Sequence, residues 1–150
     1  MKTLCELFFC IIDKTEDKMN MNTREIEDSK KYIHRGVTKY KLNKFQEAID
    51  EYNKFIEVNP ECSIGYYNRG LAYHNLKEYR KAIKDYTKSI ECKPSSPFSY
   101  YCRGLCKYNL GYYEEAIDDY KKAIELKPDY EMAYNNIEIT KQHINKLKLN

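Results

Sequence analysis

The sequence predicts an all-α protein in which antiparallel helix pairs stack into a solenoid. The first observation is a period of 34 residues between three Arg-Gly dipeptides, at 35–36, 69–70 and 103–104. The second is a proline 24 residues after each of these glycines, at Pro60, Pro94 and Pro128. The third is that each period holds two runs of residues with apolar positions at helical spacing, separated by a short break. Such a repeat is typical of units that bury their apolar faces against their neighbours.

The three segments align without a gap, so that residues of one kind fall into shared columns. The aromatic columns are Tyr32, Tyr66, Tyr100 and Tyr52, Tyr86, Tyr120, and the aliphatic or small ones are Leu42, Leu76, Leu110, then Ala48, Ala82, Ala116, then Ile49, Ile83, Ile117. Over residues 29–130 this pattern resembles the tetratricopeptide repeat family. The family most often has Trp in its first aromatic column and Leu before the glycine, where this chain has Tyr and Arg.

The resemblance implies a right-handed superhelical α-solenoid of antiparallel helix pairs. We expect one domain over 29–150, with repeats at 29–62, 63–96 and 97–130 and a capping helix at 131–147. In that capping helix Ile137-Glu138 replaces Arg-Gly, so no further helix needs to approach closely. Met132, Ala133, Ile137 and Ile144 are expected to face the third repeat.

Within each repeat, the glycine of the Arg-Gly dipeptide lies inside the first helix. Glycine there costs roughly 1 kcal/mol relative to alanine, so we expect a compensating close approach by the second helix and its alanine column. The breaks between the two helices are predicted at 43–44, 77–78 and 111–112. Asn43 and Gly111 suit the left-handed conformation that ends a helix, whereas Lys77 suits it poorly.

Residues 1–28 are predicted to form an N-terminal extension that is helical or partly disordered. Residues 3–12 are apolar except for Glu6, and residues 13–28 are polar and charged. The segment lacks the basic start, unbroken apolar centre and cleavage site of a signal peptide, and it is too short to span a bilayer. We expect either a short helix that docks on the repeats or a mis-chosen start, with Met19 or Met21 as the true one. The predicted location is cytoplasmic.

Composition and motifs argue against several classes of function. With 42% hydrophobic and 33% charged residues, the chain has an ordinary helical balance, and a net charge of +3 without basic clusters disfavours nucleic acid.

The six cysteines form no Cys-x-x-Cys pair, so Cys102 and Cys106 are interpreted as small buried residues, with a metal or redox site that includes His74 as the alternative. No catalytic motif is present. We therefore expect no cofactor, no metal, no membrane insertion and no enzyme.

In the family, the first helices line a concave groove that holds an extended or helical segment of a partner protein. The resemblance therefore implies a protein–protein interaction adaptor. It assigns to the groove the residues Ile33, Val37, Tyr40, Tyr67, Asn68, Leu71, His74, Phe98, Tyr101, Leu105 and Tyr108. Because columns such as Tyr66, Leu76 and Tyr86 are expected to supply the core, this second apolar stripe is more than the fold requires.

One subclass of the family holds chaperone-tail carboxylates with a clamp of Lys, Asn and Arg. At the clamp columns this chain has Ile33, Val37, Asn68, Phe98 and Cys102, so the expected partner is apolar and not such a tail. The alternative hypothesis is a self-associating structural protein whose groove is filled by its own residues 4–12.

The recurring arginines Arg35, Arg69 and Arg103 have two interpretations. In the first, each arginine pairs with an acid on a second helix, such as Asp50, Asp85 or Asp119. The alternative is a ladder that binds phosphate.

Overall fold

A computed structural model describes residues 23–149 of the chain. This part consists of seven helices: α2 (Thr23–Lys41), α3 (Phe45–Val58), α4 (Ser63–Asn75), α5 (Tyr79–Cys92), α6 (Pro97–Asn109), α7 (Tyr113–Leu126) and α8 (Glu131–Lys148). The fold is the all-α helical solenoid that the repeats predict. Helix α2 begins before residue 29, where the first repeat was expected to start, and α8 matches the predicted capping helix closely. The predictions for residues 1–22 lie outside the described residues.

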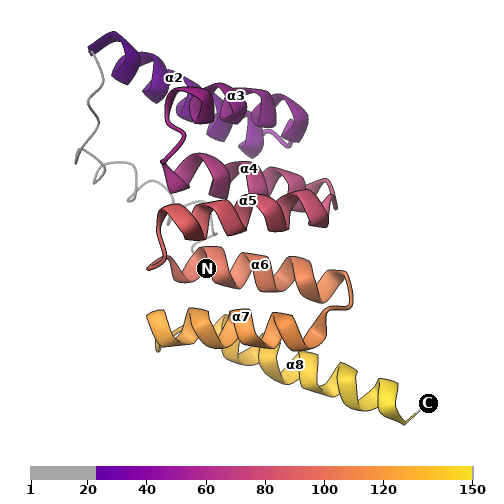
Figure 1. Cartoon of the computed structure of the whole chain (residues 1–150). Helices are drawn as coiled ribbons and strands as arrows, with labels where there is room; N and C mark the ends of the chain where they lie inside the picture. The colour runs from indigo at the N-terminus through magenta and orange to yellow at the C-terminus, as the bar shows by residue number, and fades with distance from the viewer. Residues whose placement is uncertain (1–22, 150) are drawn as a thin grey trace.

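The helices follow one another in chain order along the stack, from α2 at one end to α8 at the other (Figure 1). They form the pairs α2–α3, α4–α5 and α6–α7, and α8 follows the last pair. Each helix packs against the next, and α4 also contacts the first helices on either side of it, α2 and α6. The first helices of the pairs therefore share one side of the stack. In the described part of the chain, no helix has the length and apolar character needed to cross a membrane.

The glycine column is explained by the tyrosine column of the second helices. A Cβ atom on Gly70 would lie 2.9 Å from the Tyr86 ring, and one on Gly104 would lie 2.7 Å from the Tyr120 ring. Gly36 faces Tyr52 in the same way. The close approach that the sequence predicts is present, but a tyrosine ring rather than the alanine side chain occupies the space beside each glycine.

The core contains the alanine column and the Tyr52, Tyr86, Tyr120 column, all of them buried. The leucine column differs from the prediction, because Leu42 is 63% exposed and Leu76 is 37% exposed. Both leucines follow the last residue of a first helix, at Lys41 and Asn75, and so lie on the turn and not under the second helix.

Lys77 adopts the left-handed conformation that the sequence indicated it would tolerate poorly. Its φ is 59°, close to that of Asn43 at 59°, whereas Gly111 has a φ of 81°. In this region a Cβ atom crowds the carbonyl oxygen that follows it, so Lys77→Gly is expected to raise the free energy of unfolding by about 0.5–1 kcal/mol. Urea denaturation measures this change, with Asn43→Gly as the control that gains less because asparagine tolerates the conformation. A loss of stability in Lys77→Gly would contradict the expectation.

Candidate functional site

Hydrogen bonds between side chains 35 residues apart join neighbouring first helices. Asn75 Nδ2 on α4 donates to the Tyr40 hydroxyl on α2 at 2.7 Å. The Tyr108 hydroxyl on α6 is hydrogen-bonded to His143 Nδ1 on α8 at 2.5 Å. Asn136 Nδ2, also on α8, donates to the Tyr101 hydroxyl at 2.8 Å. Helix α8 is therefore placed as the next member of the first-helix series.

An aliphatic residue lies at the middle of each first helix, between the side chains that reach its two neighbours. On α4, Leu71 lies one turn from Asn75, which bonds back to α2, and one turn from Tyr67, which approaches Cys102 on α6. Its equivalents at 34-residue intervals are Val37, Leu105 and Ile139. We call these four residues the aliphatic row. The first three are half-buried and Ile139 is 44% exposed, so every member of the row keeps some surface outside the helix packing.

The structure divides the residues that the sequence assigned to the groove. Seven are half-buried on the first helices: Val37, Tyr40, Leu71, His74, Phe98, Leu105 and Tyr108. The other four, Ile33, Tyr67, Asn68 and Tyr101, are buried. The Tyr67 hydroxyl lies 3.6 Å from Cys102 Sγ, and the Tyr101 ring centroid lies 4.8 Å from that of Tyr130. Asn68 Nδ2 donates to the Ile64 carbonyl of its own helix. These four side chains are therefore engaged within the stack of helices.

Two residues of α8 that the sequence analysis left out of the groove continue its columns. Met132 and Ile139 are each 44% exposed. They share one side of α8 with Asn136 and His143, the residues that bond to α6. Met132 therefore lies on the side of α8 that meets α6 of the third repeat, and it stays partly exposed there. The signal that locates both residues is the period itself, since Met132 follows Phe98, and Ile139 follows Leu105, by 34 residues.

The side chains on this side of the stack carry little charge. We call the columns that contain the aliphatic row and its flanking positions the first-helix face. Its members are Lys30, Ile33, His34, Val37, Tyr40 and Lys41 on α2; Ile64, Tyr67, Asn68, Leu71, His74 and Asn75 on α4; Phe98, Tyr101, Cys102, Leu105, Tyr108 and Asn109 on α6; and Met132, Asn135, Asn136, Ile139, Gln142 and His143 on α8. On α4, α6 and α8 none of these is Asp, Glu, Lys or Arg. Basic side chains enter only on α2.

The arginine column is engaged inside the stack. Arg69 donates to Asp85 from Nε at 2.8 Å and from Nη2 at 2.7 Å, and its Nη1 reaches Asn53 of the preceding pair at 2.8 Å. Arg103 repeats this arrangement with Asp119 and Thr87. These contacts confirm the pairing interpretation for both arginines and leave the phosphate alternative without support.

At the first position of the arginine column the predicted partner is wrong. Arg35 pairs with Glu51 at 2.9 Å and not with Asp50. Glu51 is buried whereas Asp50 is exposed, and the 16-residue spacing between arginine and acid is the same as in the other two pairs. No second-helix side chain precedes Arg35 in the described part of the chain, and its side chain is 52% exposed.

Cys102 and Cys106 are both buried in the packing between helix pairs. Burial raises the pKa of the Cys102 thiol to about 11, which disfavours a thiolate near neutral pH. Across residues 23–149, no three His, Cys, Asp or Glu side chains are gathered as metal ligands would be. The two cysteines therefore pack as small apolar side chains.

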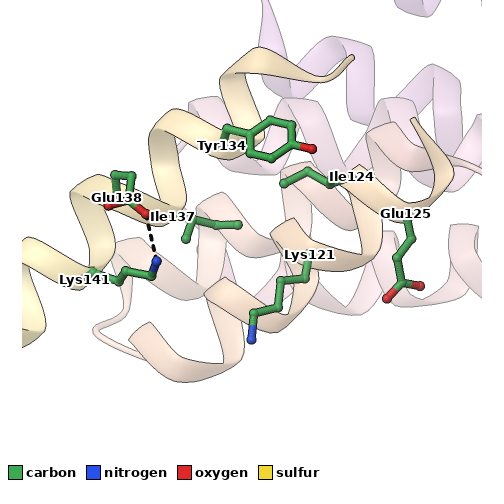
Figure 2. A pocket seen from close by; sticks show the side chains of 7 residues that line it. All are labelled: Lys121, Ile124, Glu125, Tyr134, Ile137, Glu138 and Lys141. Carbon is green, nitrogen blue, oxygen red and sulfur yellow. Dashed lines mark hydrogen bonds and ion pairs between the residues drawn. The ribbon is translucent and has the colours of Figure 1, made fainter. Parts of the chain in front are cut away.

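A pocket of about 510 Å³ lies between α7 and α8 at the end of the stack (Figure 2). It is lined by Lys121, Ile124, Glu125, Tyr134, Ile137, Glu138 and Lys141. Glu138 occupies the column that holds glycine in the preceding pairs, so a tyrosine-bearing second helix cannot approach α8 as closely as it approaches α6. Lys141 Nζ lies 2.8 Å from Glu138 Oε1, which gives this end of the stack a polar border.

Comparison with protein families identifies the repeat. A family model described as "Tetratricopeptide repeat" matches residues 63–96 and 97–130, and one described as "TPR repeat" matches residues 36–77. Together the matches extend from residue 36 to residue 130, which is more than half of the chain. The chain belongs to the tetratricopeptide repeat family. No sequence among the curated proteins matches it.

Solved tetratricopeptide repeat domains share the fold over most of the chain. The first TPR of Spaghetti (RPAP3), bound to an HSP90 peptide, is 26% identical with a TM-score of 0.78, covering 85% of this chain and 99% of that one. The first TPR domain of human RPAP3 is 28% identical with a TM-score of 0.77, and the match covers 81% of this chain and 96% of that domain. The Arabidopsis OM64 TPR domain is 26% identical with a TM-score of 0.77, and the match covers 79% of this chain and 98% of that domain. A tetratricopeptide repeat protein of this kind is a protein-interaction module.

Proposed function

We propose that this protein is an adaptor that holds an apolar segment of a partner protein, extended or helical, against the first-helix face. The observation that carries this proposal is the aliphatic row of Val37, Leu71, Leu105 and Ile139, which crosses four helices without a charged residue. Aliphatic and aromatic anchors on such a surface favour burial of a partner's apolar side chains. Phe98 and Met132 add apolar contact area beside the row.

Chaperone tails are the ligands of two of the similar structures. The first TPR of Spaghetti (RPAP3) binds the HSP90 peptide SRMEEVD, and the second TPR domain of human RPAP3 binds the HSP70 peptide SGPTIEEVD. At the clamp columns of this chain, Ile33 and Cys102 are buried and Asn68 Nδ2 donates to the Ile64 carbonyl within its own helix. None of the five clamp positions, Ile33, Val37, Asn68, Phe98 and Cys102, holds a cation that could neutralise a carboxylate. We therefore propose a partner other than such acidic tails.

The test replaces the two central residues of the aliphatic row, as Leu71→Glu with Leu105→Glu. Burying two carboxylates under an apolar segment is strongly unfavourable, so partner capture should fall at least tenfold, about 1.4 kcal/mol or more. Quantitative affinity purification from native cells gives the partner list, and calorimetry on the most enriched partner gives the affinity. The matched control, Leu42→Glu with Leu147→Glu, places the same charges on exposed leucines outside the face. The proposal would be wrong if the Leu71/Leu105 variant kept the same partner list while its circular dichroism spectrum showed the helical content of the wild type.

Self-association through residues 4–12 stays the second hypothesis, and those residues lie outside the described part of the chain. Deletion of residues 1–22 tests it by light scattering. The self-associating protein would dissociate to smaller oligomers or monomers, whereas the adaptor would keep its oligomeric state. The cytoplasmic location and the absence of catalysis stay predictions of the sequence.

A further inference from the structure

The hydrogen-bonded pairs between first helices leave one equivalent pair open on the first-helix face. The pairs Tyr40–Asn75 and Tyr108–His143 each join residues 35 positions apart on neighbouring helices. The same spacing relates His74 on α4 to Asn109 on α6, between the other two. Asn109 Nδ2 donates only to the Leu105 carbonyl of its own helix at 2.8 Å among the described residues, whereas Asn75 Nδ2 donates both to the Leu71 carbonyl and to Tyr40. The His74 ring has no hydrogen bond within the described residues. The His74 ring nitrogens and the Asn109 Oδ1 atom are therefore available for hydrogen bonds, whereas the equivalent side chains of the two neighbouring pairs bond to each other.

His74 is suited to act as a neutral hydrogen-bonding group. Its ring is half-buried, with the Tyr79 ring centroid 5.5 Å away. Burial lowers the pKa of His74, so the imidazole is neutral near pH 7 and carries one donor and one acceptor nitrogen. The Oδ1 atom of Asn109 adds a second acceptor.

The open pair lies beside the centre of the aliphatic row. His74 follows Leu71 by three residues and Asn109 follows Leu105 by four, so each lies one turn away on the same side of its helix. A partner segment that places apolar side chains on Leu71 and Leu105 therefore holds the side chains between those anchors within reach of His74 and Asn109.

The charges of the face indicate which partner group fits there. No Asp, Glu, Lys or Arg side chain belongs to the first-helix face on α4, α6 or α8. A partner carboxylate or ammonium group buried at the open pair would lose its hydration without gaining a counter-charge. A neutral amide or hydroxyl would find both a donor and an acceptor. A purely apolar group would leave the imidazole nitrogens unpaired.

We propose that His74 and Asn109 form a specificity-determining pair that receives a neutral side chain of the partner, an amide or a hydroxyl, next to apolar residues seated on Leu71 and Leu105. This inference rests on the proposed adaptor function. Because packed helices lie roughly 8–10 Å apart, the two apolar anchors should be about three residues apart in an extended segment or about seven apart in a helix. The polar residue should stand at a constant offset from them.

The test uses a displayed library of random peptides of about 15 residues, long enough to cross two first helices in either conformation. The library is selected in parallel on the wild-type protein, on His74→Leu, and on the Leu71→Glu, Leu105→Glu variant. We expect the wild type to enrich two apolar positions with Asn, Gln, Ser or Thr at a constant offset. His74→Leu should keep the apolar positions and lose the polar preference. His74→Gln, which retains a donor and an acceptor, should recover much of it.

A peptide from the wild-type selection then quantifies the contact. Replacing its polar residue by an apolar one of similar size should weaken binding to the wild type about tenfold and leave binding to His74→Leu unchanged. Apolar enrichment with no polar preference, with an acidic or basic preference at that offset, or with the same preference in His74→Leu, would overturn this inference alone. Failure of the wild type to enrich any peptide over the Leu71→Glu, Leu105→Glu variant would overturn the proposed function itself.

Discussion

The free energy of unfolding is expected to fall steeply above about pH 10, because burial in the core raises the pKa of several tyrosines and so disfavours their ionisation in the folded protein. Burial raises the pKa of Tyr67, Tyr86, Tyr120 and Tyr130 above the usual value of 10.0. In the unfolded chain these phenols lose their protons from about pH 10, whereas in the folded protein they keep them. The stability that these tyrosines contribute is therefore complete below pH 10 and is lost as the pH rises above it.

Each of these tyrosines contributes a loss of about 1.4 kcal/mol per pH unit between its unfolded and folded pKa values. Four together make the loss roughly 5 kcal/mol per pH unit, comparable with the whole stability of an ordinary domain. The Cys102 thiol, with a pKa raised from 9.0 to about 11, adds a shallower fall that begins near pH 9. Urea denaturation at a series of pH values measures the slope.

Tyr120→Phe provides the control for this prediction. The Tyr120 side chain is fully buried and its hydroxyl has no hydrogen-bond partner in the described structure. Removing the hydroxyl should therefore raise stability at pH 7 by about 1 kcal/mol and reduce the alkaline slope by about 1.4 kcal/mol per pH unit. An alkaline slope equal to that of the wild type would show that Tyr120 ionises without unfolding.

Asp119→Ala is expected to cost about 3–5 kcal/mol, because it leaves two cations of α6 without their shared partner. Asp119 is buried on α7. It accepts hydrogen bonds from Arg103 Nε at 2.9 Å and Nη2 at 2.7 Å, and Lys107 Nζ lies 2.9 Å from its Oδ2. The side chains of Arg103 and Lys107 are only 17% and 15% exposed, so water cannot fully replace the carboxylate.

The neighbouring residue Asp118 supplies a matched comparison. Its side chain is 78% exposed and faces only Lys121 on its own helix, at 3.9 Å. Asp118→Ala should therefore change stability by less than about 0.5 kcal/mol. Chemical denaturation of the two variants side by side checks the difference. Equal effects at the two positions would mean that the arginine column contributes little to holding the pairs together.

Much of the fold and part of the site were predictable from the period. A 34-residue repeat places equivalent residues on equivalent helices, which is why the pairing of Arg69 with Asp85 was expected correctly. The Asp50 prediction was wrong because Asp50 lies one position before the equivalent Glu51, and one residue on a helix turns a side chain by about 100°. Leu42 shows the same limit, since its column is periodic but lies on a turn.

The amino-acid sequence by itself determined the helix pairs, the family, the columns of the first-helix face and the absence of charge on that face from α4 onward. Only the tertiary structure decided which members of those columns are buried between helices and which keep exposed surface. Ile33, Tyr67 and Tyr101 are buried, whereas Met132 and Ile139 of α8 remain exposed. It also decided that the side chains of His74 and Asn109 do not bond to each other, although the equivalent pairs on either side do. The physical reason is that periodicity assigns a residue to a side of its own helix, while its exposure depends on the distance and angle at which the next helix packs against it.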